Sequence, residues 1–285
     1  MPELPEVQAH AERLTATLAG LELTGFDALT FSVLKTFAPP PDAPLGRELQ
    51  QVGRRGKHLL LALGDLTYVV HLMQGGRLRV GAAGDGRARP RGGRRGAQPV
   101  ARWSFADGRA LLLTEAGSER RAGVWMIAGD PLAAEPLAGL GPEADDVDVP
   151  EMAAMLQAHS MRLHTFLRKQ QVIAGLGRRL ANEVCHTAGL SPFAPTGRLA
   201  DDAGRLVEAI GACVTQSLAV ERALDDMSAS RERPGGVHGR TGQPCPACQD
   251  SVRAVEYRGY TVNYCATCQT GGKVLADNTT SKFLK

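Results

Sequence analysis

The sequence predicts an α+β protein with an N-terminal two-layer β-sandwich and flanking helices, a helical middle, and a small C-terminal hairpin. Three observations predict this fold class. Short segments rich in β-forming residues, separated by turns, fill much of the first half of the chain. Helical periodicity replaces them after a linker rich in proline, glycine and acids. Four of the six cysteines then fall after residue 240.

The chain opens on MPELPEV, in which two prolines and two glutamates occupy the first six residues. Behind this motif, residues 7–18 place apolar side chains at helical spacing, which predicts an early helix. From these residues alone, Pro2 is either part of a stiff leader or the start of a chemically reactive terminus.

Five β-forming segments follow this helix. They lie at 58–63, 66–72, 101–105, 110–115 and 123–128. Turn signals such as Gly64-Asp65 and Asp107-Gly108 separate them, so the succession reads as hairpins of a sandwich or barrel. The linker at 129–150 ends this region.

A basic stretch interrupts the β-forming segments. Eight arginines against one acid, Asp85, lie between Arg77 and Arg102, although the net charge of the whole chain is only +3. We expect its glycine-rich core, residues 81–99, to be a mobile loop that either meets a polyanion or is a solvated connector.

Beyond the linker the periodicity predicts four helices. They lie at 150–158, 161–170, 177–189 and 201–220. Between the second and third, Gly175 and Gly177 permit a tight turn, after which a helix begins with unpaired N–H groups beside Arg178 and Arg179. This helix–turn–helix-like element is suited to bind phosphate, although any helical hairpin could need the glycines for packing. Cys185 and Cys213 fall in helical sequence, and we expect both to be small buried apolar residues.

The four C-terminal cysteines are the strongest metal signal in the chain. Two C-x2-C pairs, Cys245 with Cys248 and Cys265 with Cys268, are separated by sixteen residues. This spacing predicts a four-cysteine Zn²⁺ site, in which a hairpin brings the second pair of thiolates to the first. Disulfides are the alternative, disfavoured in a cytosolic protein. Four protein ligands leave no open position, so the zinc would be structural.

The sequence gives no sign of export or membrane insertion. No apolar run approaches the roughly 18 residues of a membrane span, and the N-terminus carries acids instead of a basic stretch followed by an apolar core. We therefore expect a cytoplasmic protein, associated with the nucleoid if it binds DNA.

Together, these motifs resemble the formamidopyrimidine-DNA glycosylase/endonuclease VIII family of base-excision repair enzymes. They are MPELPEV, RRGKHLLLAL, HLMQGG, GSERRAGVW, QQVIAGLGRRLANEV and the CxxC pairs, in the family order from Met1 to about Gln269. The resemblance implies a monomeric bifunctional DNA glycosylase and abasic-site lyase that acts on oxidised bases in double-stranded DNA. It also implies four segments: a catalytic sandwich at 1–132, a helix-two-turn-helix domain at 133–237, a zinc finger at 238–272 and a basic tail at 273–285.

The resemblance assigns catalysis to Pro2, Glu3 and Lys57. Removal of Met1 would expose the Pro2 amine, and a chain-terminal amine has a pKa near 8, so about ten per cent is neutral at pH 7. A secondary amine that attacks the sugar C1′ forms an iminium with no N–H proton left to lose, which is an electron sink for β-elimination. Glu3 would protonate the departing base or opened sugar, and Lys57 would contact a phosphate and assist proton transfer.

DNA contacts are likewise implied by position in the family pattern. The expected residues are Glu6, His71, Gln74, Arg120, Arg121, Arg178 and Arg258. Of these, His71 is expected near the DNA backbone, and Arg120 is expected to contact the base left opposite the lesion.

The chain departs from the family pattern at several of these positions. Ala122 stands where the family has a phenylalanine wedge, so the void left by a flipped base would be filled by Met73 or Gln74 or not at all. Arg178 replaces an asparagine, and Tyr260 replaces an arginine that clamps phosphates and supports δ-elimination. Arg258, two residues away on the same strand face, is a candidate substitute.

Two other functions stay open on the sequence. A DNA-binding paralogue without excision would have no use for the retained Pro2-Glu3 pair, which favours an enzyme. A lyase specialised for abasic sites would fit the missing wedge at Ala122. The segment at 217–237, in the place of the family's lesion-capping loop, does not indicate which base is recognised.

Overall fold

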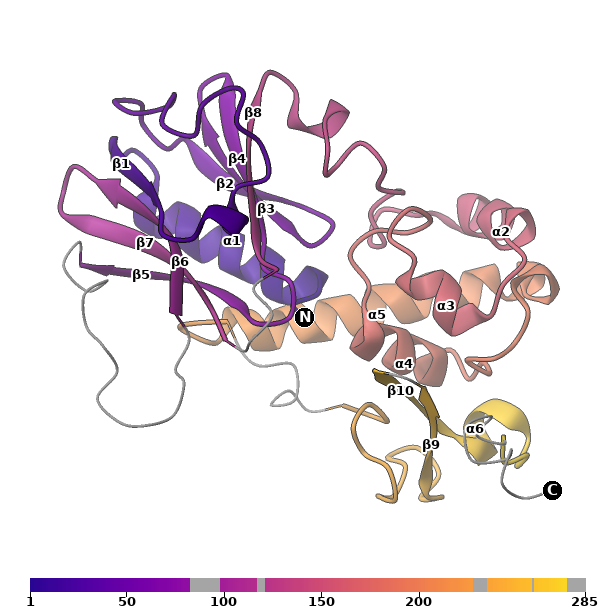
Figure 1. Ribbon diagram of the computed structural model, residues 1–285. Coiled ribbons are helices and arrows are strands. Elements are labelled where there is room, and N and C mark those ends of the chain that lie inside the picture. Colours follow the sequence, from indigo (N-terminus) through magenta and orange to yellow (C-terminus); the bar gives the residue numbers. More distant parts are fainter. Residues whose placement is uncertain (83–97, 117–120, 228–234, 258, 276–285) are drawn as a thin grey trace. The chain divides into compact units, whose positions relative to one another are not determined.

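In a computed structural model the chain forms two compact units (Figure 1). The structure describes residues 1–82, 98–116, 121–227, 235–257 and 259–275. The first unit combines Met1–Gly139 with Glu221–Met227, and the second combines Leu140–Val220 with Ser228–Lys285. The hairpin with the four cysteines therefore belongs to the same unit as the helices, and the division into four segments stays a prediction.

The first unit is a β-sandwich with one long helix. Its elements are α1 (Leu4–Leu18), β1 (Leu23–Ala28), η1 (Phe31–Val33), β2 (Gln51–Arg55), β3 (His58–Leu63), β4 (Leu66–His71), β5 (Gly76–Ala82), β6 (Gln98–Phe105), β7 (Arg109–Glu115), β8 (Gly123–Ala128) and η3 (Pro131–Ala133). Two antiparallel four-stranded sheets have the orders β1-β6-β7-β5 and β2-β3-β4-β8. The predicted two-layer sandwich is confirmed.

The core of this unit lies between the two sheets. Tyr68 on β4 of one sheet meets Trp103 on β6 of the other edge-on, with ring centroids 5.6 Å apart, and Phe26 on β1 packs against both. Helix α1 covers β2, where the Thr15 hydroxyl accepts the Val52 N–H at 2.8 Å. This contact fixes the last turn of α1 to the first residues of β2.

Strand β5 differs from the sequence-based expectation. Arg77 and Arg79 belong to the basic stretch for which no strand was expected, but they lie on a strand whose alternation sends Leu78 into the core, where it is buried. The predicted loop, residues 81–99, is shorter than expected, because residues 81–82 end β5 and residues 98–99 begin β6. Its remainder, residues 83–97, lies outside the described residues.

The second unit is helical with a terminal hairpin. Its elements are α2 (Val149–Ala158), α3 (Leu163–Arg168), α4 (Arg178–Thr187), η4 (Thr196–Arg198), η5 (Ala200–Asp202), α5 (Ala203–Arg222, whose last two residues fall in the first unit), β9 (Val252–Tyr257), β10 (Tyr260–Cys265) and α6 (Ala266–Thr270). Helix α4 packs against α3 on one side and β10 on another. All four expected helices are present. The fold-class prediction, including the cysteine-bearing hairpin, is confirmed.

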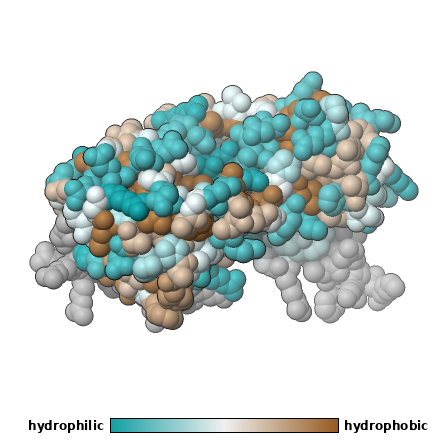
Figure 2. Space-filling model, turned by 90° about the horizontal axis from the view of Figure 1, so that it is seen from above, coloured by the Kyte–Doolittle hydropathy of each residue, from teal (hydrophilic) through white to brown (hydrophobic). Residues whose placement is uncertain are grey.

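One face of the molecule mixes polar and apolar side chains (Figure 2). The face drawn in Figure 2 intersperses hydrophilic and hydrophobic residues, without one dominant apolar area. Among the described residues, no helix combines the length and apolarity that a membrane crossing requires.

Candidate functional site

The amino terminus is fixed by the start of α1. Glu3 and Glu6 form a capping box, in which the Glu6 carboxylate accepts the Glu3 N–H at 3.1 Å, and Pro5 stands in the first turn. Met1 is exposed, whereas Pro2 and both glutamates are buried. The helix therefore holds the first residues in one conformation, and removal of Met1 would leave the proline nitrogen at a rigid position.

The β2–β3 turn carries Lys57. Gly56 takes a φ of 55°, which this two-residue turn requires, and Lys57 beside it is only 4% exposed. Arg54 fixes the turn to α1, because its Nε donates to Gln8 Oε1 at 3.0 Å and its Nη1 donates to the Gly56 carbonyl. Arg54 thus supports Lys57, a role that its position in a basic run did not indicate.

Two histidines pair beside this turn. His58 on β3 and His71 on β4 are cross-strand partners with ring centroids 4.5 Å apart. Burial lowers the pKa of His58 to about 4, with a further contribution from Lys57. Burial lowers the pKa of His71 to about 3, and His58, Lys57 and the chain's amino terminus lower it further.

These shared effects place three sequence-predicted groups close together in the first unit. The amino terminus and Lys57 both lie near enough to His71 to lower its pKa. Because His58 and His71 stay neutral at pH 7, they add no positive charge beside the terminal amine. A terminal amine near a buried lysine is an arrangement suited to nucleophilic attack and proton transfer.

The turn after β4 presents Gln74. Its backbone closes through the Gly76 N–H, which donates to the Leu72 carbonyl at 2.8 Å, and Gln74 at its tip is exposed. A Cβ on Gly75 would lie 2.4 Å from the Ala116 carbonyl oxygen, so only glycine fits there. Gln74 is therefore held outward, and its DNA contact stays a prediction.

The segment before β8 is held by Glu115. This buried carboxylate accepts the backbone N–H groups of Arg121 and Ala122 at 2.9 and 3.1 Å. Ala122 is 2% exposed and belongs to the hydrophobic core, so its side chain does not project as a wedge, and its correspondence to the family's phenylalanine position stays a prediction. Arg121 is exposed, and Arg120 lies outside the described residues.

In the second unit, the turn between α3 and α4 is built around Gln170. Its side chain accepts the Gly175 N–H at 3.1 Å and donates to the Leu176 carbonyl at 2.8 Å. Gly175 has a φ of 96°, which explains the glycine. The guanidinium of Arg178, predicted to bind phosphate, donates to the Gly259 carbonyl of the hairpin instead of standing free. Arg258 lies outside the described residues.

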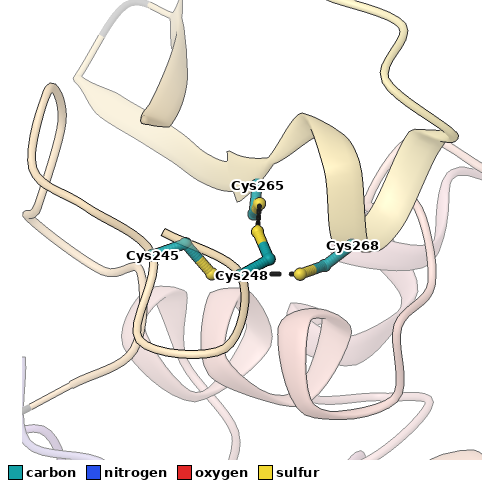
Figure 3. Close-up of side chains that lie close together, drawn as sticks. All are labelled: Cys245, Cys248, Cys265 and Cys268. Carbon is teal, nitrogen blue, oxygen red and sulfur yellow. Dashed lines mark hydrogen bonds between the residues drawn. The ribbon is translucent and has the colours of Figure 1, made fainter. Parts of the chain in front are cut away.

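The four cysteine sulfurs converge between the hairpin and α6 (Figure 3). All four Sγ atoms lie within 4.8 Å of one another, with 3.4 Å between Cys248 and Cys265 and 3.9 Å between Cys245 and Cys268. Four thiolates at tetrahedral Zn–S distances would be about 3.8 Å apart. These distances fit a metal site and exclude disulfides, whose sulfurs bond at about 2 Å. Cys185 and Cys213 are buried elsewhere, as expected.

Helix α4 joins this cysteine cluster to the rest of the unit. His186 Nε2 lies 3.2 Å from Cys245 Sγ, close enough to donate a hydrogen bond to a ligating thiolate. One turn earlier, the Glu183 carboxylate accepts the backbone N–H groups of residues 236–238 at 2.7–3.2 Å. The sequence offered no signal for either contact, because both depend on which helix face meets the hairpin.

The comparisons with known proteins agree on one family. The model of the formamidopyrimidine-DNA glycosylase N-terminal domain matches residues 1–125. A formamidopyrimidine-DNA glycosylase of Chloroflexus aurantiacus is 30% identical over 282 residues, spanning 94% of this chain and 98% of that protein. An uncharacterized formamidopyrimidine-DNA glycosylase-like protein of Mycobacterium tuberculosis is 41% identical over 151 residues, spanning 51% of this chain and 94% of that protein.

The fold has a similar match among solved structures. The formamidopyrimidine-DNA glycosylase of Lactococcus lactis, bound non-covalently to DNA containing an abasic site, superposes with a TM-score of 0.79. The two chains are 23% identical, and the match covers 94% of this chain and 99% of that one.

Proposed function

The chain belongs to the formamidopyrimidine-DNA glycosylase family, and we propose that it is a bifunctional DNA glycosylase and abasic-site lyase acting on oxidised bases in double-stranded DNA. One observation supports this function most: the amino terminus and Lys57 lie close to His71 in the first unit. A protein that only binds DNA does not require its terminal amine beside a buried lysine.

In the proposed reaction, the nitrogen of Pro2 attacks C1′ of the damaged nucleotide. The N–C1′ bond forms as the bond between C1′ and the base breaks, and the base leaves with the electron pair and a proton supplied by Glu3. The proline nitrogen loses its own proton, and its electron pair then forms the C1′=N bond as the C1′–O4′ bond breaks and O4′ takes a proton; this opens the sugar and leaves an iminium. Abstraction of a C2′ proton then expels the 3′ phosphate and nicks the strand.

Lys57 would bind a phosphate near the reacting sugar and assist these proton transfers. Its burial in the β2–β3 turn supports this role, because Arg54 and Gly56 hold the turn against α1. His71 would lie at the same site as Lys57. Because it is neutral at pH 7, it would add no positive charge to that of Lys57.

We further propose that Cys245, Cys248, Cys265 and Cys268 hold one structural Zn²⁺. The thiolate spacing supports this assignment, and the closed four-ligand set gives the metal a role in holding the hairpin. No step of the reaction passes through the metal.

The test is excision and nicking measured separately on matched duplexes that carry an oxidised purine, an oxidised pyrimidine or an abasic site. A glycosylase releases free base from at least one oxidised duplex and also nicks the strand. Nicking of the abasic duplex alone would replace the proposal with a dedicated abasic-site lyase. Binding without release or nicking, in protein whose terminal proline is verified by mass spectrometry, would leave only a DNA-binding role.

A further inference from the structure

The tip of the cysteine-bearing hairpin carries two stacked tyrosines. Tyr257 ends β9 and Tyr260 begins β10, and their rings are nearly parallel, 8° apart in angle with centroids 4.8 Å apart. The guanidinium carbon of Arg168, the last residue of α3, lies 4.1 Å from the centroid of the Tyr260 ring. This distance is that of a cation–π contact, which holds the arginine flat on the hairpin.

Arg168 and Arg178 have different roles around this hairpin. Arg178 donates to the Gly259 carbonyl, so its guanidinium is occupied in fastening α4 to the hairpin tip. Arg168 has no carboxylate partner in the part of the chain that the structure describes, and its Nη1 is buried there without a hydrogen-bond acceptor. Arg168 as a whole is only partly buried, so the rest of its guanidinium can meet an acceptor from outside the chain.

The surroundings of Arg168 suit an anion. His164, one turn earlier on α3, is 3% exposed and lies against the backbone of Arg178 and the side chain of Asn182 on α4. Within the described part of the chain its Nε2 has no partner at full hydrogen-bond distance. The charge of Arg168 reaches this ring, because it is among the causes that lower the pKa of His164 to about 3, after burial itself. The ten-residue helix α4 begins at Arg178, whose backbone His164 contacts. Planar guanidinium donors beside a helix start match a phosphate group.

We propose that Arg168, held by the Tyr260 ring, is the phosphate-binding cation of this unit, and that it positions the DNA strand in place of Arg178. The proposal rests on the proposed DNA-repair function, since it assigns the phosphate to DNA. It also gives Tyr260 a purpose: an aromatic ring here orients a neighbouring arginine instead of supplying a charge of its own.

The test is DNA binding by fluorescence anisotropy between 50 and 200 mM salt. The probe is a duplex with a tetrahydrofuran abasic-site analogue, beside an undamaged duplex. Arg168→Met should weaken binding to both by about tenfold and reduce the slope of log affinity against log salt by about 0.9, because one phosphate contact is lost. Lys169→Met, which removes the same charge from the adjacent exposed position, should change the slope less.

Two variants of Tyr260 test whether its aromatic ring holds Arg168 in place. Tyr260→Phe keeps the ring and should bind as the wild type does, whereas Tyr260→Leu should behave as Arg168→Met. Bound metal and thermal melting, measured on every variant, establish that the hairpin is folded.

The outcomes that overturn the proposal are distinct. If Arg168→Met keeps the wild-type affinity and salt slope, Arg168 does not bind phosphate. If Tyr260→Phe and Tyr260→Leu lose DNA affinity equally, the Tyr260 ring does not hold Arg168. Either result overturns the role of Arg168 and leaves the DNA-binding function of the protein intact. A wild-type protein that binds neither duplex would overturn this role together with the proposed function.

Discussion

Replacement of His10 by leucine should stabilise the first unit against unfolding at acidic pH. The burial of His10 determines how large this gain in unfolding free energy is. His10 on α1 is 4% exposed, beside Leu14 and Leu78, and neither ring nitrogen has a hydrogen-bond partner at full bonding distance among the described residues. Burial, and then the charge of Arg13, lower its pKa to about 4. The unfolded chain, with a histidine pKa of about 6.5, therefore binds a proton between pH 6.5 and 4 that the folded chain does not.

The sign and size follow from this difference. A folded-state pKa below the unfolded value means that stability is full above about pH 6.5 and is lost as the pH falls toward 4. Between pH 7 and pH 5 the loss from one such histidine is about 2 kcal/mol, at 1.36 kcal/mol per pH unit. His10→Leu removes this loss, and at pH 7 it also removes two unpaired polar atoms.

The assay is urea unfolding followed by tryptophan fluorescence. Both tryptophans of the chain, Trp103 and Trp125, lie in the first unit, so the signal reports that unit. The stability advantage of His10→Leu over wild type should grow by about 2 kcal/mol from pH 7 to pH 5. His159→Leu, in the second unit, is the control and should not change this transition. An advantage that is equal at both pH values would refute the reasoning.

Three further predictions follow from contacts in the two units. His186→Phe should speed zinc loss to a colorimetric chelator by about tenfold, since a hydrogen bond to the Cys245 thiolate is lost; release at the wild-type rate would contradict this. Ala122→Phe should destabilise the first unit by about 1–3 kcal/mol through overpacking, rather than sharpen opposite-base preference, and unchanged urea unfolding would place that side chain outside the core. Lys57→Met should raise the pKa of His71, because a neighbouring positive charge is removed. The measurement is the NMR shift of the His71 ring protons against pH, and an unchanged pKa would show that the charge of Lys57 does not act on His71.

The sequence was most informative where a short pattern has one structural solution. The segments at 58–63 and 123–128 combine β-forming residues with turn signals on both sides, and both are strands with those bounds. The two CxxC pairs specify their own geometry in the same way, because a tetrahedral metal site constrains the hairpin between them. Strand β5 was missed because glycines and arginines on its outward face hid the alternation of Leu78 and Val80.

The candidate site was only partly predictable, because several of its contacts depend on tertiary register. The motif order pointed to Pro2 and Lys57, but His58 pairs with His71 through the register of β3 on β4, which sequence spacing does not reveal. Likewise, a glycine turn followed by Arg178 suggested a free phosphate ligand. Only packing of α4 on the hairpin shows that this arginine is occupied and that Arg168 stands on Tyr260.

Borohydride trapping on an abasic-site duplex tests the central claim most directly, because it asks whether the terminal amine is the nucleophile. Protein that begins at Pro2 should be locked covalently to DNA when borohydride reduces the iminium. A variant with one glycine left ahead of Pro2 turns that amine into an amide, so it should still bind the duplex yet give no covalent complex. Undiminished trapping by the extended variant, with its terminus verified by mass spectrometry, would contradict the account and direct attention to Lys57.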